Sequence, residues 1–169
     1  MSVITKTGDN GTTHSPFGRV NKNHPFVNAV GALDELQANL GFLYSLIRKR
    51  KKDKVNLPAL AEAMQTIYLI QSDLYLEDQT YMFNFNVKQL EEVALKLEAK
   101  LPPLKQFIIP NRGVISSYAH VSRTVCRRAE RAIVAYITDE QADFMGGALV
   151  YINRLSDYLF ILARLYEEK

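Results

Sequence analysis

The sequence predicts an all-α protein, a five-helix up-and-down bundle that follows an extended N-terminal segment. Glycine and proline are few, at 8 and 6 of 169 residues, and cluster at the N-terminus and around Pro102–Gly113. Between these clusters, apolar residues recur at helical spacing in five stretches with short links. Because no internal repeat or domain boundary is evident, we expect one domain: a segment over residues 1–25 and a bundle over 26–169.

Composition indicates a soluble globular protein. The chain is 47% hydrophobic and 23% charged, and its 21 basic and 18 acidic residues leave a net charge of +3. That excess is too small to indicate nucleic-acid binding by itself. Cys126 is the single cysteine, which excludes an internal disulfide, suits a reducing compartment and reads as core packing. The start lacks the apolar run of a signal peptide, and no stretch approaches the length of a membrane span. We therefore predict a cytoplasmic location, with no membrane partner.

The first segment, TKTGDNGTT, combines two glycines with several threonines and an aspartate. Glycine permits backbone conformations that turn several N–H groups toward an anion, and threonine hydroxyls add donors. Asp9 is suited to a hydrated Mg²⁺ ion, and Lys22 can add a positive charge on a phosphate. No G-K-[ST] follows, so this is not a Walker A loop. The alternative is a turn-rich, partly disordered N-terminus.

The next two helices carry regular apolar stripes. The first runs from Phe26 to about Arg50, with Leu33, Leu36, Leu40, Leu43 and Ile47 facing the core. Asp34 falls on its opposite side, where a carboxylate is ordinarily just solvated. The basic run Arg48–Lys54 reads as a helix end and exposed loop, since no aromatic residues interleave it for base stacking. The second helix is expected from Pro58 through about Asn84, with Leu60, Met64, Ile67, Leu74 and Tyr81 at helical spacing.

A third helix, from about Val87 to Lys100, ends at Pro102-Pro103. The segment LKQFIIPNRGV follows as a loop or short extended stretch with three large apolar residues, Phe107, Ile108 and Ile109. An ordered apolar loop either closes over a core or walls a ligand pocket.

The fourth helix, from about Ile115 to Ile137, holds the motif RTVCRRAER. Arg123, Arg127, Glu130 and Arg131 share one face, and the apolar residues Val121, Val125, Ala129 and Ala132 are expected on the other. The simple interpretation is a solvated face with an Arg127–Glu130 pair. The use of arginine without lysine, and a single carboxylate, favour a bidentate anion site instead.

The final helix, from about Ala142 to Glu168, has a core stripe of Tyr151, Leu155, Tyr158, Leu162 and Tyr166. Its other face presents Asn153, Asp157 and Arg164. This polar stripe is placed to meet the arginine face of the preceding helix, antiparallel to it.

Five segments in order carry a resemblance to a known family: TKTGDNGTT, VGALDEL, LPPLKQFIIP, HVSRTVCRRAER and YINRLSDYLFILAR. Together they make the chain resemble the PduO-type ATP:corrinoid (cob(I)alamin) adenosyltransferases over nearly its whole length. The resemblance implies a ferritin-like five-helix bundle that forms homotrimers, with ATP between subunits. It also implies transfer of the 5′-deoxyadenosyl group of ATP to reduced cobalt, yielding adenosylcobalamin and triphosphate. A corrinoid reductase and an adenosylcobalamin-dependent enzyme are the further partners it implies.

The resemblance also assigns nucleotide-binding residues. Those expected around the triphosphate are Thr5, Thr7, Gly8, Asp9, Gly11, Thr12 and Lys22. Arg123 and Arg127 are expected to contact ATP. Glu130 is expected to orient the site and hold Mg²⁺, and Asn153 to bind the nucleotide from the last helix.

On the corrin side, the resemblance implies that Phe107 packs near cobalt and displaces the lower axial ligand, with Asp157 supporting that side. It also implies that Asp34 pairs with Arg123 across the subunit boundary, so Asp34 joins Arg123, Arg127 and Glu130 as a catalytic candidate.

Three segments depart from the family pattern: HSPFGRV has only Gly18 where a glycine pair is usual, Asn111-Arg112 replaces glycines, and DLYLEDQTYMFNFN is atypical. Two alternatives therefore remain beside the enzyme. One is a non-catalytic nucleotide or cobalamin carrier or sensor of the same fold. The other is an unrelated bundle that binds anionic polymers through Arg48–Lys54.

Overall fold

The computed structural model describes residues 4–50, 56–77, 83–140 and 145–167. A short antiparallel hairpin, β1 (Thr12–Ser15) and β2 (Gly18–Asn21), precedes five helices. The helices are α1 (Pro25–Arg48), α2 (Leu57–Leu76), α3 (Asn84–Glu98), α4 (Val114–Glu140) and α5 (Gly146–Leu165). The predicted helical bundle is thus confirmed. None of the described helices combines the length and apolar character needed to cross a membrane.

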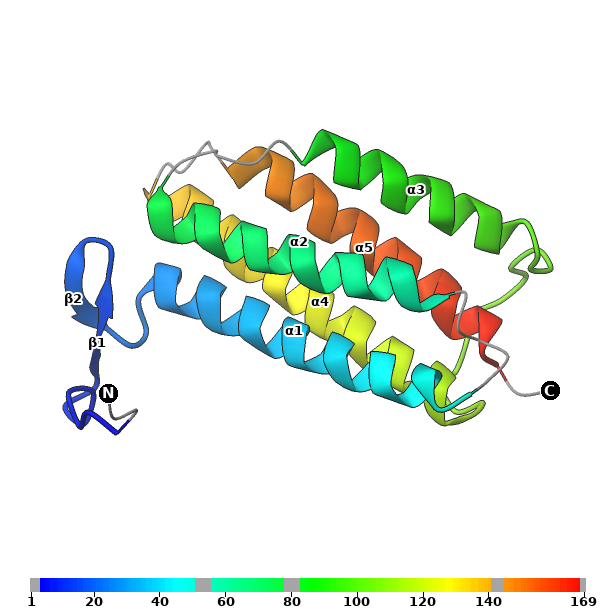
Figure 1. The fold of residues 1–169 in the computed structure, drawn as a ribbon, viewed down its shortest axis with the longest axis horizontal. Coiled ribbons are helices and arrows are strands. Elements are labelled where there is room, and N and C mark those ends of the chain that lie inside the picture. Colours follow the sequence, from blue (N-terminus) through cyan, green and yellow to red (C-terminus); the bar gives the residue numbers. More distant parts are fainter. Residues whose placement is uncertain (1–3, 51–55, 78–82, 141–144, 168–169) are drawn as a thin grey trace.

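The helices pack side by side along one long axis (Figure 1). α4 packs against both α1 and α5, α2 packs against α1, and α3 packs mainly against α5. The hairpin lies beyond one end of the bundle, whereas the loop from α3 to α4 lies at the other end (Figure 1). Features of these two segments are therefore far apart within one chain.

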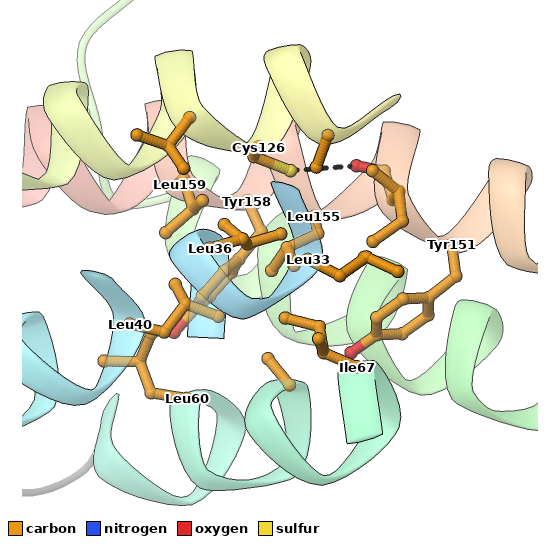
Figure 2. Packing of buried hydrophobic residues seen from close by; sticks show 14 of the residues in the cluster. Leu33, Leu36, Leu40, Leu60, Ile67, Cys126, Tyr151, Leu155, Tyr158 and Leu159 are labelled. Carbon is orange, nitrogen blue, oxygen red and sulfur yellow. Dashed lines mark hydrogen bonds between the residues drawn. The ribbon is translucent and has the colours of Figure 1, made fainter. Parts of the chain in front are cut away.

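The core follows the apolar stripes that the sequence predicts. The five stripe residues of α1, from Leu33 to Ile47, are fully buried, and those of α5, from Tyr151 to Tyr166, are buried as well. Figure 2 shows Leu33, Leu36 and Leu40 meeting side chains from α2, α4 and α5. Each fully buried leucine or isoleucine contributes roughly 1.5–3 kcal/mol relative to exposure.

The hairpin was not predicted from the sequence, and aromatic contacts join it to the bundle. Gly18 takes φ of +103°, which lets the chain turn, and Ser15 Oγ donates to the Gly18 carbonyl at 2.9 Å. Phe17 then packs edge-on against Phe26 of α1, with ring centroids 5.5 Å apart. Phe26 in turn contacts Tyr136 of α4. The HSPF departure thus builds the turn and the anchor of this hairpin.

Several helix bounds differ from the prediction. α2 ends at Leu76, because Glu77 takes a left-handed conformation at φ 51° and ψ 35°, and α3 begins three residues earlier than expected. Tyr81, most of the basic run Arg48–Lys54, and the expected start of the last helix at Ala142 lie outside the described residues.

The prediction of the buried face of α4 was partly wrong. Val125 and Ala129 are buried as expected, but Val121 is 46% exposed, and Ser122, Cys126 and Ile133 also face the core. Cys126 is in the core as predicted. Burial raises the pKa of its thiol, which donates to the Ile152 carbonyl at 3.3 Å (Figure 2).

Candidate functional site

A cavity of about 540 Å³ lies between α3, α4 and α5. Its polar walls are Arg123 and Arg127 from α4, Arg154, Ser156 and Asp157 from α5, and Glu91 and Glu98 from α3. The α4–α5 packing therefore brings together Arg123, Arg127 and Asp157, three residues predicted from the sequence. Three carboxylates balance the three guanidinium groups of the lining, and Arg154 pairs with two of them, Glu91 and Asp157. Arg123 and Arg127 form no ion pair among the described residues, so these two arginines are the groups suited to an anionic ligand.

Asn153 and Glu130 connect α5 to α4 beside this cavity. Asn153 Nδ2 donates to Glu130 Oε1 at 2.8 Å. The expected meeting of the polar stripe of α5 with the arginine face of α4 is thus confirmed at this contact. The simple alternative, an Arg127–Glu130 ion pair, is not formed between these two described residues.

Arg154 is a site residue that the sequence analysis missed. Its Nε donates to Glu91 Oε1 at 2.6 Å, and its Nη1 lies 3.0 Å from Asn153 Oδ1 and 3.4 Å from Asp157 Oδ2. The contacts with Glu91 and Asp157 raise the pKa of its guanidinium, with the Glu91 hydrogen bond as the largest cause. The i,i+3 spacing of Arg154 and Asp157 in the sequence could have indicated their contact. Nothing in the sequence indicated that Glu91 on α3 would be the other partner.

His120 lies one turn before Arg123 and is only 5% exposed. Its ring packs edge-on against Phe160, with centroids 5.9 Å apart. Neither ring nitrogen has a hydrogen-bond partner among the described residues, and the same holds for Nε of Arg123. Burial lowers the pKa of His120, the charge of Arg123 lowers it further, and the charge of Glu167 opposes both in part. The neutral imidazole is therefore favoured.

The predicted N-terminal residues lie in the loop before β1, at the start of β1 and directly after β2. The hydroxyls of Thr5 and Thr7 form a hydrogen bond of 3.0 Å. Lys22 N donates to the Gly11 carbonyl at 2.9 Å, and Gly11 takes φ of +79°. Lys22 Nζ lies so close to Gly8 that a Cβ there would be 3.1 Å away, so a larger residue would require the lysine side chain to shift. Asp9 belongs to the same loop, and Thr12 is the first residue of β1.

Arg19 was also missed by the sequence analysis. Its Nη2 donates to the Thr7 carbonyl and to Thr12 Oγ1, the latter at 2.6 Å. Arg19 therefore ties the threonine- and glycine-rich loop to the hairpin and fixes the loop's shape. Its place in the GRV segment gave no indication of this partner.

Asp34 does not meet Arg123 within the chain. Asp34 lies exposed on α1 and accepts from Gln71 Nε2 of α2 at 2.7 Å. Arg123 instead lines the cavity between α3, α4 and α5. The neighbouring Glu35 turns toward α4 and pairs with Arg128. The pairing of Asp34 with Arg123 across a subunit boundary stays a prediction.

Phe107 is fully exposed on the loop between α3 and α4. A second cavity, of about 410 Å³, lies between this loop and the C-terminal end of α5. Arg164 of α5 donates to the Pro102 carbonyl, and Arg112 pairs at 3.7 Å with Glu167, which follows α5, so the C-terminal end of the chain contacts both ends of the loop. The departure residues Asn111 and Arg112 line this second cavity.

The fit of a divalent cation rests on Glu130. Among the described residues, no group of three or more histidine, cysteine, aspartate or glutamate side chains is arranged to hold a metal. Mg²⁺ needs only one or two protein carboxylates when substrate phosphates and water complete its shell. Glu130, held by Asn153 beside two arginines, fits such an ion bound together with a triphosphate.

Comparisons with known proteins give a consistent result. Residues 3–166 match the cobalamin adenosyltransferase family. The chain is 35% identical to a bovine corrinoid adenosyltransferase over 96% of this chain and 70% of that protein. It is 37% identical to a cobalamin adenosyltransferase of Cupriavidus metallidurans over 96% of this chain and 86% of that protein.

A solved structure agrees in fold as well. A variant PduO-type ATP:corrinoid adenosyltransferase from Lactobacillus reuteri, complexed with cobalamin and ATP, superposes with a TM-score of 0.86 at 34% identity. The match covers 97% of this chain and 90% of that chain. Together with the family match over nearly the full length, this shows that the chain belongs to the cobalamin adenosyltransferase family.

Proposed function

We propose that this protein transfers the 5′-deoxyadenosyl group of ATP to the cobalt of reduced cob(I)alamin and releases triphosphate. The observation that carries the proposal is the cavity in which Arg123 and Arg127 meet, beside the Asn153–Glu130 pair, in a chain of this family. The relative from Lactobacillus reuteri binds both cobalamin and ATP.

The reaction needs positioning and charge stabilisation more than a protein nucleophile. The electron pair of cobalt(I) attacks C5′ of the ribose, a cobalt–carbon bond forms, and the C5′–O bond breaks. Triphosphate leaves with the bonding electrons. Arg123 and Arg127 donate hydrogen bonds to the phosphates and stabilise this developing charge. The buried Cys126 thiol, whose pKa is raised, has no part in the chemistry.

The N-terminal loop is proposed to surround the triphosphate. Lys22, lying over Gly8, supplies a cation, and the hydroxyls of Thr5, Thr7 and Thr12 supply donors. The backbone at Gly8, Asp9 and Gly11 completes the turn that carries them. These contacts would bind the part of ATP that becomes the leaving group.

Glu130 and Asn153 are proposed to bind the nucleotide and its Mg²⁺ ion from the bundle side. When bound, Mg²⁺ neutralises phosphate charge and so favours departure of the triphosphate. Asn153 holds the Glu130 carboxylate in place through the 2.8 Å hydrogen bond.

Phe107 and Asp157 are proposed to serve the corrinoid. An apolar ring against the lower face of the corrin excludes water and an axial ligand, which makes four-coordinate cobalt(II) easier to reduce. Full exposure of Phe107 leaves its ring available for such a contact. Asp157 borders the cavity that also holds Arg123 and Arg127.

A homotrimer with ATP between subunits is the proposed assembly. The hairpin and the Phe107 loop lie at opposite ends of the bundle (Figure 1), and Asp34 faces α2 while Arg123 faces the cavity. A neighbouring chain that brings its own N-terminal loop would supply what one chain lacks. A cytoplasmic location, a corrinoid reductase and an adenosylcobalamin-dependent acceptor enzyme complete the proposal.

A second candidate is a non-catalytic carrier or sensor of the same ligands. Two departures from the family pattern favour it. His14–Phe17 lies in the hairpin next to the proposed triphosphate loop, and Asn111–Arg112 lines the cavity beside the Phe107 loop proposed for the corrinoid. A carrier binds ATP and cobalamin without releasing triphosphate.

The test is anaerobic transfer with the protein, MgATP and chemically reduced cob(I)alamin, followed by absorbance as the cobalt–carbon bond forms. We expect conversion with one triphosphate released per adenosylcobalamin. ATP binding without conversion would contradict the enzyme and favour the carrier.

A further inference from the structure

Arg154 makes contacts in three directions at the wall of the main cavity. Its guanidinium donates to Glu91 on α3, to the side-chain oxygen of Asn153, and to Asp157 one turn further along α5. Nη1 is shared between the last two acceptors, at 3.0 Å and 3.4 Å. One side chain therefore touches both a residue proposed for the nucleotide and a residue proposed for the corrinoid.

The chemistry of these groups allows Asn153 only one amide orientation. A guanidinium has donors and no acceptor, so the atom of Asn153 that faces Arg154 must be the oxygen. The amide nitrogen is then left to face Glu130, whose carboxylate only accepts, and it does so at 2.8 Å. A flipped amide would set donor against donor at Arg154 and acceptor against acceptor at Glu130.

Glu91 makes this orientation rigid. Arg154 donates to Glu91 at 2.6 Å through Nε, whereas it donates to Asn153 through Nη1, so the two acceptors use different nitrogens of the guanidinium. α3 is thereby linked through Arg154 and Asn153 to Glu130 on α4. The Nε of Arg154 is thus hydrogen-bonded to Glu91, whereas the Nε of Arg123 has no partner among the described residues.

We propose that Arg154 is a positioning residue. Anchored by Glu91, it fixes the Asn153 amide so that its N–H orients Glu130, and it holds Asp157 with the same nitrogen. It thereby links the nucleotide side of the site to the corrinoid side. The inference rests on the proposed function for the roles of Asn153, Glu130 and Asp157, whereas the hydrogen-bonded chain itself does not.

The test uses Arg154→Lys, which keeps the charge but cannot donate in a planar fork to three acceptors. We expect the KM for ATP to rise about tenfold, as for loss of a hydrogen bond to a charged group, with a smaller rise for cob(I)alamin. Glu91→Gln keeps an acceptor but loses the charge, so a smaller rise in the same direction is expected. Glu92→Gln, at an exposed neighbouring position on α3, is the matched control and should leave both KM values unchanged.

A double-mutant comparison separates positioning from mere structural support. In an Asn153→Ala background, Arg154→Lys should change the KM for ATP less than twofold, because its route to Glu130 is already removed. A full tenfold loss in that background, or wild-type KM values in Arg154→Lys itself, would overturn the proposal. Thermal unfolding checks that each variant is folded. If Arg154→Lys does not fold, the KM values of Glu91→Gln test the proposal in its place.

A readout without substrate distinguishes failure of this inference from failure of the proposed function. The side-chain amide of Asn153 should give well-dispersed NMR signals that exchange slowly with water in the free protein. Arg154→Lys should shift and broaden them, and Glu92→Gln should not. Unchanged signals overturn the positioning role. A wild-type protein that shows these signals yet transfers no adenosyl group contradicts only the proposed function.

Discussion

At the scale of single residues, spacing predicted faces but not partners. The periodicity of RTVCRRAER placed Arg123 and Arg127 together, and both line the cavity. It also placed Glu130 beside Arg127, yet Glu130 bonds to Asn153, 23 residues further along the chain. Local sequence cannot rank an i,i+3 neighbour against a residue from another helix, because the packing of α4 on α5 decides between them. Arg154, Arg19 and Gln71 were missed for the same reason.

Arg127 gives the sharpest prediction at this scale. Its side chain is exposed, so Arg127→Ala should leave folding intact. Loss of a guanidinium from the developing triphosphate charge should lower kcat for transfer by a factor of at least about 10². Arg131→Ala removes an exposed arginine of the same helix that does not line the cavity, and is the control. Normal turnover by Arg127→Ala in the anaerobic assay would remove the proposed phosphate site.

At the scale of elements, long periodic stretches were predicted well and short irregular ones were not. The apolar stripes of α1 and α5 are buried as expected. The end of α2 was missed because Glu77 takes a left-handed conformation without the glycine or asparagine that usually announces one. The hairpin was missed because each strand has only four residues and the stability comes from Phe17 packing on α1.

The loop between α3 and α4 carries a prediction about the state of cobalt. Because Phe107 is fully exposed, Phe107→Ala should not destabilise the bundle. We expect a large loss of transfer when cobalt(II) must be reduced on the protein, and a smaller loss when cob(I)alamin is supplied. Ile109→Ala, another exposed apolar residue of this loop, controls for general loss of apolar surface. Equal losses under both conditions would contradict a role in displacing the axial ligand.

At the scale of the whole molecule, the position of the N-terminal loop is the decisive feature. Lys22 and the threonines precede α1 at one end of the bundle, and the Phe107 loop lies at the other (Figure 1). Asp34, turned toward Gln71, is not paired with Arg123 in the described chain. This separation supports the proposed assembly, in which the N-terminal loop of one subunit covers the arginines of the next.

Mixed assemblies test this arrangement directly. Lys22→Ala damages the N-terminal loop and Arg127→Ala damages the helix, so each variant alone should be nearly inactive. If one site draws Lys22 from one subunit and Arg127 from the next, random co-assembly of equal amounts restores about one quarter of the sites, as ring symmetry requires. Sites built within single chains would leave every site of the mixture with one damaged residue. Activity in the co-assembled sample near that fraction, with sedimentation giving the mass of three chains, supports the shared site. Activity no higher than that of the separate variants contradicts it, because mixing subunits then creates no intact pair of Lys22 and Arg127.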